Sequence, residues 1–134
     1  MEPWQLWLNM ALDSLQASQT LADNKLWRSS ASRCYYAAFQ AATALLLYCR
    51  MTPPEEREAW SHEDTPDILR DHITPLVTSR DRRKDLANRL RELYKIRVVA
   101  DYIGSVPFSE DRVSVARKDA GYIVKFAEKL LVER

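Results

Sequence analysis

Glycine is scarce in this chain, with only two among 134 residues, while leucine, alanine, arginine and glutamate are abundant. Such a composition favours helices over sheets. No stretch alternates apolar and polar residues between turn signals, as a half-buried strand would. With 46% hydrophobic and 29% charged residues, the balance is that of an ordinary soluble domain. The sequence therefore predicts an all-α protein.

Cysteine is also scarce, and the two present are not expected to pair with each other. Cys34 and Cys49 fall on one predicted helix, which places them about 22 Å apart at the rise of an α-helix. That separation is beyond the reach of a disulfide. The start of the chain, MEPWQLW, is acidic and lacks the basic segment of a signal peptide. We therefore expect reduced thiols and a cytoplasmic protein.

Long apolar runs and metal-binding clusters are missing as well. The longest apolar run, YYAAFQAATALLLYC, contains Gln40 and Thr43 and is too short and too polar to span a membrane. His62 and His72 lie ten residues apart, which is not the spacing of a helical metal pair. Because Cys, His and carboxylates do not cluster in the sequence, we expect no metal and no cofactor.

The chain has almost no net charge, with 20 Lys and Arg against 19 Asp and Glu. The total gives no indication of a nucleic-acid partner, so only a local patch could. Residues 80–97 form such a patch, with eight basic and three acidic side chains. The basic ones are Arg80, Arg82, Arg83, Lys84, Arg89, Arg91, Lys95 and Arg97. A solvated helix face is the simpler explanation, and an RNA or nucleotide surface is the alternative.

Helical periodicity is pronounced over most of the chain. Apolar residues recur at helical spacing over four long stretches, residues 4–22, 26–51, 81–103 and 109–130. Pro53 and Pro54 end the second helix, Thr65 and Pro66 begin a short third one, and Ser79 caps the fourth. A polar loop separates the second helix from the third. The pattern predicts an antiparallel four- to five-helix bundle, in one domain spanning the whole chain, with the second helix at its centre.

A charged pair interrupts the apolar stripe of the predicted fourth helix. Leu86, Leu90 and Leu93 define the buried face, and Arg97 continues it. Arg97 therefore points inward or along a seam, and Asp101 lies one turn further on, within its reach. A desolvated charge needs a partner, and Asp101 is the expected one. The pair is either a structural ion pair or part of a site in which Arg97 binds a phosphate.

Three segments together resemble the HEPN domains of bacteria and archaea, which are small helical bundles often paired with minimal nucleotidyltransferases. The segment SRCYYAAFQAATALL (32–46) is similar to that family's second helix, with its paired tyrosines before a leucine run. The segment WSHEDTPDILRDHI (60–73) resembles the Ser-His stretch that leads into the short third helix. The segment LYKIRVVADYI (93–103) resembles the Arg-x-x-x-Asp-Tyr signature of one HEPN branch.

The resemblance implies a homodimer in which the signature helices meet near the two-fold axis. It also implies that some relatives are RNA-cutting toxins restrained by a nucleotidyltransferase antitoxin. Catalytic branches carry an Arg followed within several residues by a His, but here no His follows Arg97. Asp101 and Tyr102 occupy that region, so any catalysis would depend on Arg97 and Asp101. In some relatives a motif tyrosine accepts nucleotide from the partner enzyme, and Tyr102 is the nearest match.

Arg33 and Tyr36 complete the predicted nucleotide- or RNA-binding set with Arg97 and Tyr102. Tyr35 and Tyr36 are adjacent, so at most one of them can lie fully in the core, and the other could line a cleft or a dimer seam. His62 is interpreted as a loop or capping residue.

Three functions remain open at this point: an RNA-directed toxin, a non-catalytic module that binds a nucleotide or a partner nucleotidyltransferase, and a plain helical dimerisation domain. The second helix is apolar nearly all round, and Arg97 and Asp101 point inward. A single bundle of this length is not expected to shield both from solvent. The sequence therefore predicts a two-fold dimer burying about 1,200 Å² or more.

Overall fold

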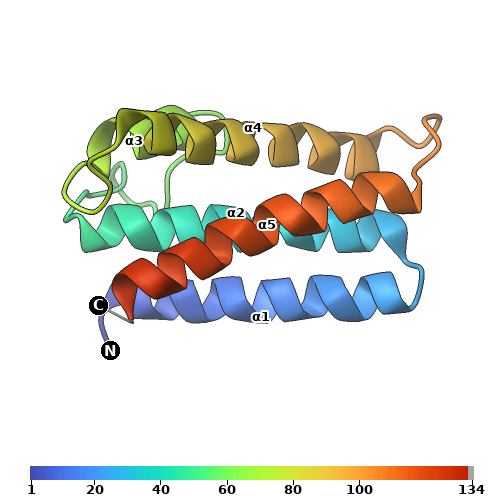
Figure 1. Cartoon of the computed structure of the whole chain (residues 1–134), viewed down its shortest axis with the longest axis horizontal. Coiled ribbons are helices and arrows are strands. Elements are labelled where there is room, and N and C mark those ends of the chain that lie inside the picture. The colour runs from blue at the N-terminus through green and yellow to red at the C-terminus, as the bar shows by residue number, and fades with distance from the viewer. Residues whose placement is uncertain (133–134) are drawn as a thin grey trace.

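A computed structural model describes residues 1–132 and contains helices only, with no strand in that range. Its four long helices alternate in direction along the bundle, and a short fifth helix lies between the second and third of them (Figure 1). They are α1 (Pro3–Asp23), α2 (Trp27–Tyr48), α3 (Thr65–His72), α4 (Arg80–Tyr102) and α5 (Glu110–Leu131). The predicted all-α antiparallel bundle is therefore confirmed. None of these helices, within the described part of the chain, has both the length and the apolar character needed to cross a membrane.

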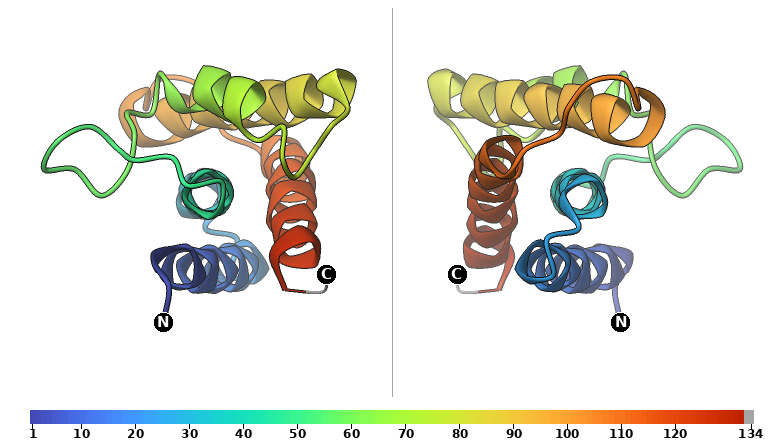
Figure 2. Two further views of the ribbon diagram at one scale, coloured as in Figure 1. Left: turned by 90° about the vertical axis from the view of Figure 1, so that its left-hand side faces the viewer. Right: turned by 90° about the vertical axis from the view of Figure 1, so that its right-hand side faces the viewer.

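Helix α2 lies at the centre of the bundle. Viewed along its axis, α1, α4 and α5 surround it on three sides, and the connection between α2 and α3 projects on the fourth (Figure 2). Tyr35, Leu45 and Leu46 are fully buried on α2, and Leu90 and Ile123 close the core from α4 and α5. A single chain thus buries most of α2 between Ser30 and Leu46, with Ser32, Arg33 and Tyr36 left partly exposed. The apolar circumference of α2 is therefore no reason to require a second copy.

Helix boundaries follow the local signals, with small differences. Ser79 caps α4 as predicted, because its hydroxyl accepts a hydrogen bond from the Arg82 amide at 3.3 Å. Helix α2 stops at Tyr48 rather than Met51, since Arg50 takes up a left-handed conformation with a φ of 63°. The N-cap of α3 is Asp64. Thr65 is instead buried as its first residue, with its hydroxyl donating to the Ser61 carbonyl at 2.6 Å.

Lys25 ends α1 in the left-handed region, with a φ of 60°, at a position where helices usually carry glycine. We expect Lys25→Gly to raise the free energy of unfolding by about 0.5–1 kcal/mol, because glycine removes the strain of the side chain there. Thermal or urea unfolding measures the change. As a control, Lys118→Gly within α5 is expected to lower stability by about 1 kcal/mol. A loss of stability in Lys25→Gly as well as in Lys118→Gly would contradict the assignment of backbone strain to Lys25.

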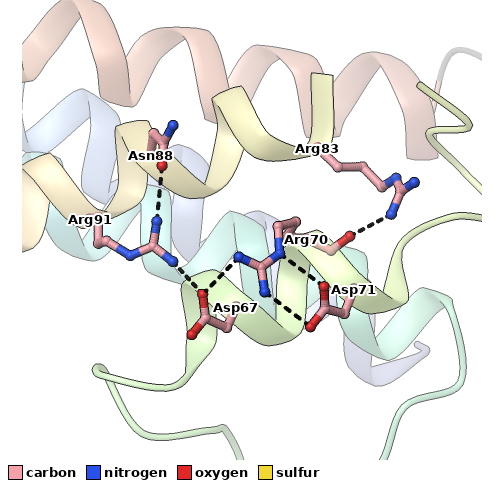
Figure 3. Close-up of polar contacts among 6 residues, drawn as sticks. All are labelled: Asp67, Arg70, Asp71, Arg83, Asn88 and Arg91. Atoms are coloured by element: carbon pink, nitrogen blue, oxygen red, sulfur yellow. Dashed lines mark hydrogen bonds and ion pairs between the residues drawn. The ribbon is translucent and has the colours of Figure 1, made fainter. Parts of the chain in front are cut away.

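A polar network fastens α3 to α4 (Figure 3). Arg91 of α4 forms an ion pair with Asp67 of α3 and donates to Asn88 at 2.9 Å. Arg83 donates to the main-chain carbonyl of Arg70 at 2.7 Å, near the carboxyl end of α3. Because α3 is docked in this way, the turn that precedes it has a defined place against α2 and α4.

The connection between α2 and α3, residues 49–64, is anchored at its end. Trp60 is 7% exposed and belongs to the main hydrophobic core. Ser61 then forms the turn into α3, accepting a hydrogen bond from the Asp64 amide at 3.1 Å through its hydroxyl. These two anchors fix His62, the residue that follows Ser61, beside α2.

Candidate functional site

Arg97 lies inside the bundle edge, at the contact of α4 with α2. Its side chain is only 13% exposed, as its place in the leucine stripe predicts. The terminal nitrogen Nη2 donates to the hydroxyl of Tyr36 at 2.9 Å and to that of Tyr102 at 3.3 Å. The guanidinium also lies 5.4 Å from the ring centre of Tyr36 and 5.1 Å from that of Tyr102. Two tyrosines from two helices therefore hold the guanidinium in place.

Asp101 is the ionic partner of Arg97, as the four-residue spacing predicts. Its Oδ2 lies 3.0 Å from Nε of Arg97 and accepts a hydrogen bond from the Ser32 hydroxyl at 3.1 Å. The Nε–H bond is poorly aligned with that oxygen, so Nε has no hydrogen-bond partner within residues 1–132 although it is buried. The pair is thus coulombic rather than a bidentate fork, and it leaves part of the guanidinium's donor capacity unused.

Arg33 brings a second guanidinium to the same tyrosine. It lies 4.9 Å from the ring centre of Tyr36, half-buried on α2. Within residues 1–132, Arg33 forms no ion pair, and Asp101 is the one carboxylate paired with Arg97. Two guanidiniums therefore lie against one ring, and one of them, Arg97, is paired with a carboxylate. An anion placed beside Tyr36 would be attracted by this excess.

Tyr102 and Tyr36 differ in access to solvent. Tyr102 is 69% exposed near the end of α4, while Tyr36 is half-buried on α2. Tyr35 lies fully in the core. This agrees with the expectation that at most one of the two adjacent tyrosines would be fully buried. Arg33, Tyr36, Arg97, Asp101 and Tyr102 are thus brought together at one place, from helices α2 and α4.

The basic run of residues 80–97 is largely occupied by intramolecular contacts. Arg89 pairs with Asp85 at 2.9 Å and with Asp119 of α5 at 2.7 Å. Lys95 pairs with Glu92 at 3.1 Å, and Arg83 and Arg91 are engaged with α3. Much of the predicted patch is thereby neutralised, so the local charge around Tyr36 is a better guide to anion binding than the run itself.

His62 is the site neighbour that sequence reasoning missed. Instead of a capping role, its ring lies 4.6 Å from Phe39 and 6.0 Å from Tyr36, ring centre to ring centre. Its Nδ1 is 2.6 Å from the hydroxyl of Tyr35. No spacing rule connects residue 62 with residue 35. The one available signal was the adjacency of the Ser-His stretch to the helix start in the resemblance.

Burial lowers the pKa of His62, and the positive charge of Arg97 lowers it further. The unfolded chain, with a histidine pKa of about 6.5, then binds more protons than the folded one on acidification. This contribution to stability is fully present above about pH 6.5 and is lost as pH falls toward the folded pKa.

We therefore expect His62→Asn to reduce the fall in melting temperature between about pH 7.5 and about pH 5.5. His72→Asn is the matched control, because His72 is exposed at the end of α3. It should keep the parent's pH dependence. Equal pH dependence in the parent and both variants would exclude a depressed His62 pKa.

Comparison with known proteins agrees with this fold. The family model for the HEPN domain matches residues 4–131. A protein of Methanocaldococcus jannaschii named "Putative toxin MJ0605" is 40% identical over 52 residues, a match that covers 39% of each chain. The "UPF0332 protein glr0978" of Gloeobacter violaceus is 31% identical over 98 residues, covering 73% of this chain and 71% of that protein. With the family model matched over nearly its full length, the chain belongs to the HEPN domain family.

Proposed function

We propose that this chain is the HEPN module of a prokaryotic toxin–antitoxin or nucleotidyltransferase-associated system and binds the phosphate of an RNA or nucleotide beside Arg97. The observation that supports the proposal most is the pair of guanidiniums, Arg33 and Arg97, which lie 4.9 and 5.4 Å from the ring centre of Tyr36. Arginine donors in a fixed fork suit phosphate oxygens, and Arg33 has no carboxylate partner within residues 1–132.

The toxin role is supported by the name of the Methanocaldococcus relative and by membership of the family. In the proposed system, a minimal nucleotidyltransferase serves as the antitoxin partner. The exposed hydroxyl of Tyr102, next to Arg97, is then the group to which that partner would add a nucleotide. Incubating the chain with such an enzyme and ATP and measuring its intact mass, in parent and Tyr102→Phe, tests this part.

A partner-binding or dimerisation role is the second candidate. It is favoured by Tyr102 and Ile103, which are 69% and 38% exposed at the end of α4, beside the site. We propose that this end of α4 contributes to a homodimer interface of about 1,200 Å² or more. Sedimentation at micromolar concentration should show a dimer, and Ile103→Lys should shift it toward monomer. A monomeric parent would exclude the homodimer.

Removal of the second guanidinium tests phosphate binding. We expect Arg33→Ala to weaken binding of a labelled single-stranded RNA or of ATP by about tenfold, because a bidentate phosphate contact is lost. Affinity of the parent should also fall as salt rises, since RNA phosphates release counterions on binding. Fluorescence anisotropy measures both effects.

The control is Arg57→Ala, which removes an exposed arginine near Leu6 and Trp7. It should leave the affinity within about twofold, since it lies outside the proposed contact. Equal losses in Arg33→Ala and Arg57→Ala would indicate general charge attraction and contradict a site at Tyr36. Comparison of RNA with ATP shows which of the two phosphate sources the site accepts.

A further inference from the structure

The ring of His62 is held between α2 and α4. It stacks on Tyr94 of α4, with ring centres 6.0 Å apart and an interplanar angle of 13°. On the α2 side it contacts Tyr35, Tyr36 and Phe39, at 5.4, 6.0 and 4.6 Å. A loop residue that was merely solvated would not need this aromatic enclosure. The ring therefore has a fixed position beside the α2–α4 contact.

Tyr36 contacts both His62 and Arg97. Arg97 donates to the hydroxyl of Tyr36, and His62 meets the ring of Tyr36 edge-on at 79°. The groups that face His62 are thus the hydroxyl of Tyr35 and the rings of Tyr36 and Phe39 from α2. From α4 they are the ring of Tyr94 and the charge of Arg97. Arg97 is close enough for its charge to depress the histidine pKa. A phosphate bound between the two guanidiniums would oppose that effect.

Tyr35 occupies one ring nitrogen of His62 and leaves the other without a partner within residues 1–132. Its hydroxyl is 2.6 Å from Nδ1, and its pKa is raised by burial, so it stays a neutral hydroxyl at any physiological pH. When Nδ1–H donates to this oxygen, Nε2 carries the free lone pair of the ring. Nε2 itself has no hydrogen-bond partner within residues 1–132, and it is not among the side-chain atoms sealed from solvent without one. A buried group orients the imidazole while the opposite nitrogen stays available.

We propose that His62 is the proton-transfer residue of the Arg97 site, acting on an RNA phosphodiester held by Arg97 and Arg33. This inference rests on the proposed phosphate-binding function. Nε2 accepts the proton of the ribose 2′-hydroxyl while that oxygen forms a bond to phosphorus. The bond from phosphorus to the 5′-oxygen breaks, and the departing oxygen takes a proton from water. The products are a 2′,3′-cyclic phosphate and a 5′-hydroxyl, and His62 returns its proton to solvent.

In this role His62 provides the imidazole that the sequence after Arg97 lacks. In sequence, His62 precedes Arg97 by 35 residues and belongs to a different element. In space, both residues contact the ring of Tyr36. Tyr35 is a positioning residue in this account, because it acts on the substrate only through His62.

The first arm of the test is RNA cleavage under single-turnover conditions, with the parent, His62→Asn, Tyr35→Phe and the control His72→Asn. We expect the parent to form 2′,3′-cyclic phosphate ends. His62→Asn should lower the rate by about 100-fold while RNA affinity stays within about threefold of the parent. The rate of the parent should rise with pH and reach its plateau below the pH expected of an ordinary histidine. Tyr35→Phe should lower the rate by about tenfold and shift that pH profile.

The second arm needs no activity. NMR titration of His62 in the parent, alone and saturated with AMP, should show its pKa rising when the phosphate binds. RNA binding without cleavage, or cleavage unchanged in His62→Asn, would overturn the role of His62 and leave the phosphate-binding function in place. Absence of binding to both RNA and AMP would instead remove the proposed function itself. His62→Gln is the second variant should His62→Asn fail to fold.

Discussion

Replacement of Arg97 with alanine is expected to lower the free energy of unfolding by about 2–3 kcal/mol. The change leaves the Asp101 carboxylate, which is 27% exposed, without its ionic partner. It also removes two hydrogen bonds to tyrosine hydroxyls and the packing of the guanidinium against their rings. Asp101 keeps the hydrogen bond from Ser32, which limits the loss. Urea unfolding of the parent and the variant measures the difference.

The double variant Arg97→Met, Asp101→Leu shows how much of the stability loss comes from leaving the Asp101 carboxylate without a partner. We expect it to recover most of the stability lost in Arg97→Ala, because two apolar side chains can fill the same space without a buried unpaired charge. A double variant no more stable than Arg97→Ala would mean that the tyrosine contacts, rather than the stranded Asp101, account for the loss.

Replacement of Trp60 with alanine is expected to cost about 3–5 kcal/mol, since a large core side chain is removed. Trp60 anchors the end of the 49–64 connection in the main core. Its loss should therefore release His62 from its place against Tyr35. Alongside urea unfolding, NMR should show the His62 pKa moving up toward the ordinary histidine value of about 6.5.

Trp60→Phe is the control, because it keeps an aromatic ring in the core and should retain a low His62 pKa. If Trp60→Ala folds and leaves the titration of His62 unchanged, the anchoring role assigned to Trp60 is wrong. The contact of His62 with Tyr35 would then be maintained by the Ser61 turn and α3 alone.

Local patterns in the sequence were sufficient for the elements and for one half of the site. Proline positions and the Ser79 cap located helix ends to within a few residues. The Arg97–Asp101 pair followed from four-residue spacing on an apolar stripe, because contacts within one helix depend only on helical geometry.

Contacts between different helices could not be predicted from local patterns in the sequence. His62 meets Tyr35 only because α3 docks on α4 and Trp60 enters the core, and neither event leaves a periodic signal around residue 62. Likewise, the basic run of residues 80–97 appears charged in sequence, yet Asp67 and Asp119 neutralise two of its arginines from other helices. The single-chain covering of α2 is a further packing result that its apolar composition did not determine.

The central claim, that Arg97 and its neighbours bind phosphate, is tested most directly by the RNA affinity of the double variant Arg97→Met, Asp101→Leu beside its melting temperature. The substitutions remove one positive and one negative charge, so the net charge of the chain does not change. We predict a melting temperature near that of the parent and an affinity at least tenfold weaker, since the phosphate contact is gone. An equally well-folded double variant with the affinity of the parent, for RNA and for ATP alike, would contradict the claim and leave the pair a purely structural contact between helices.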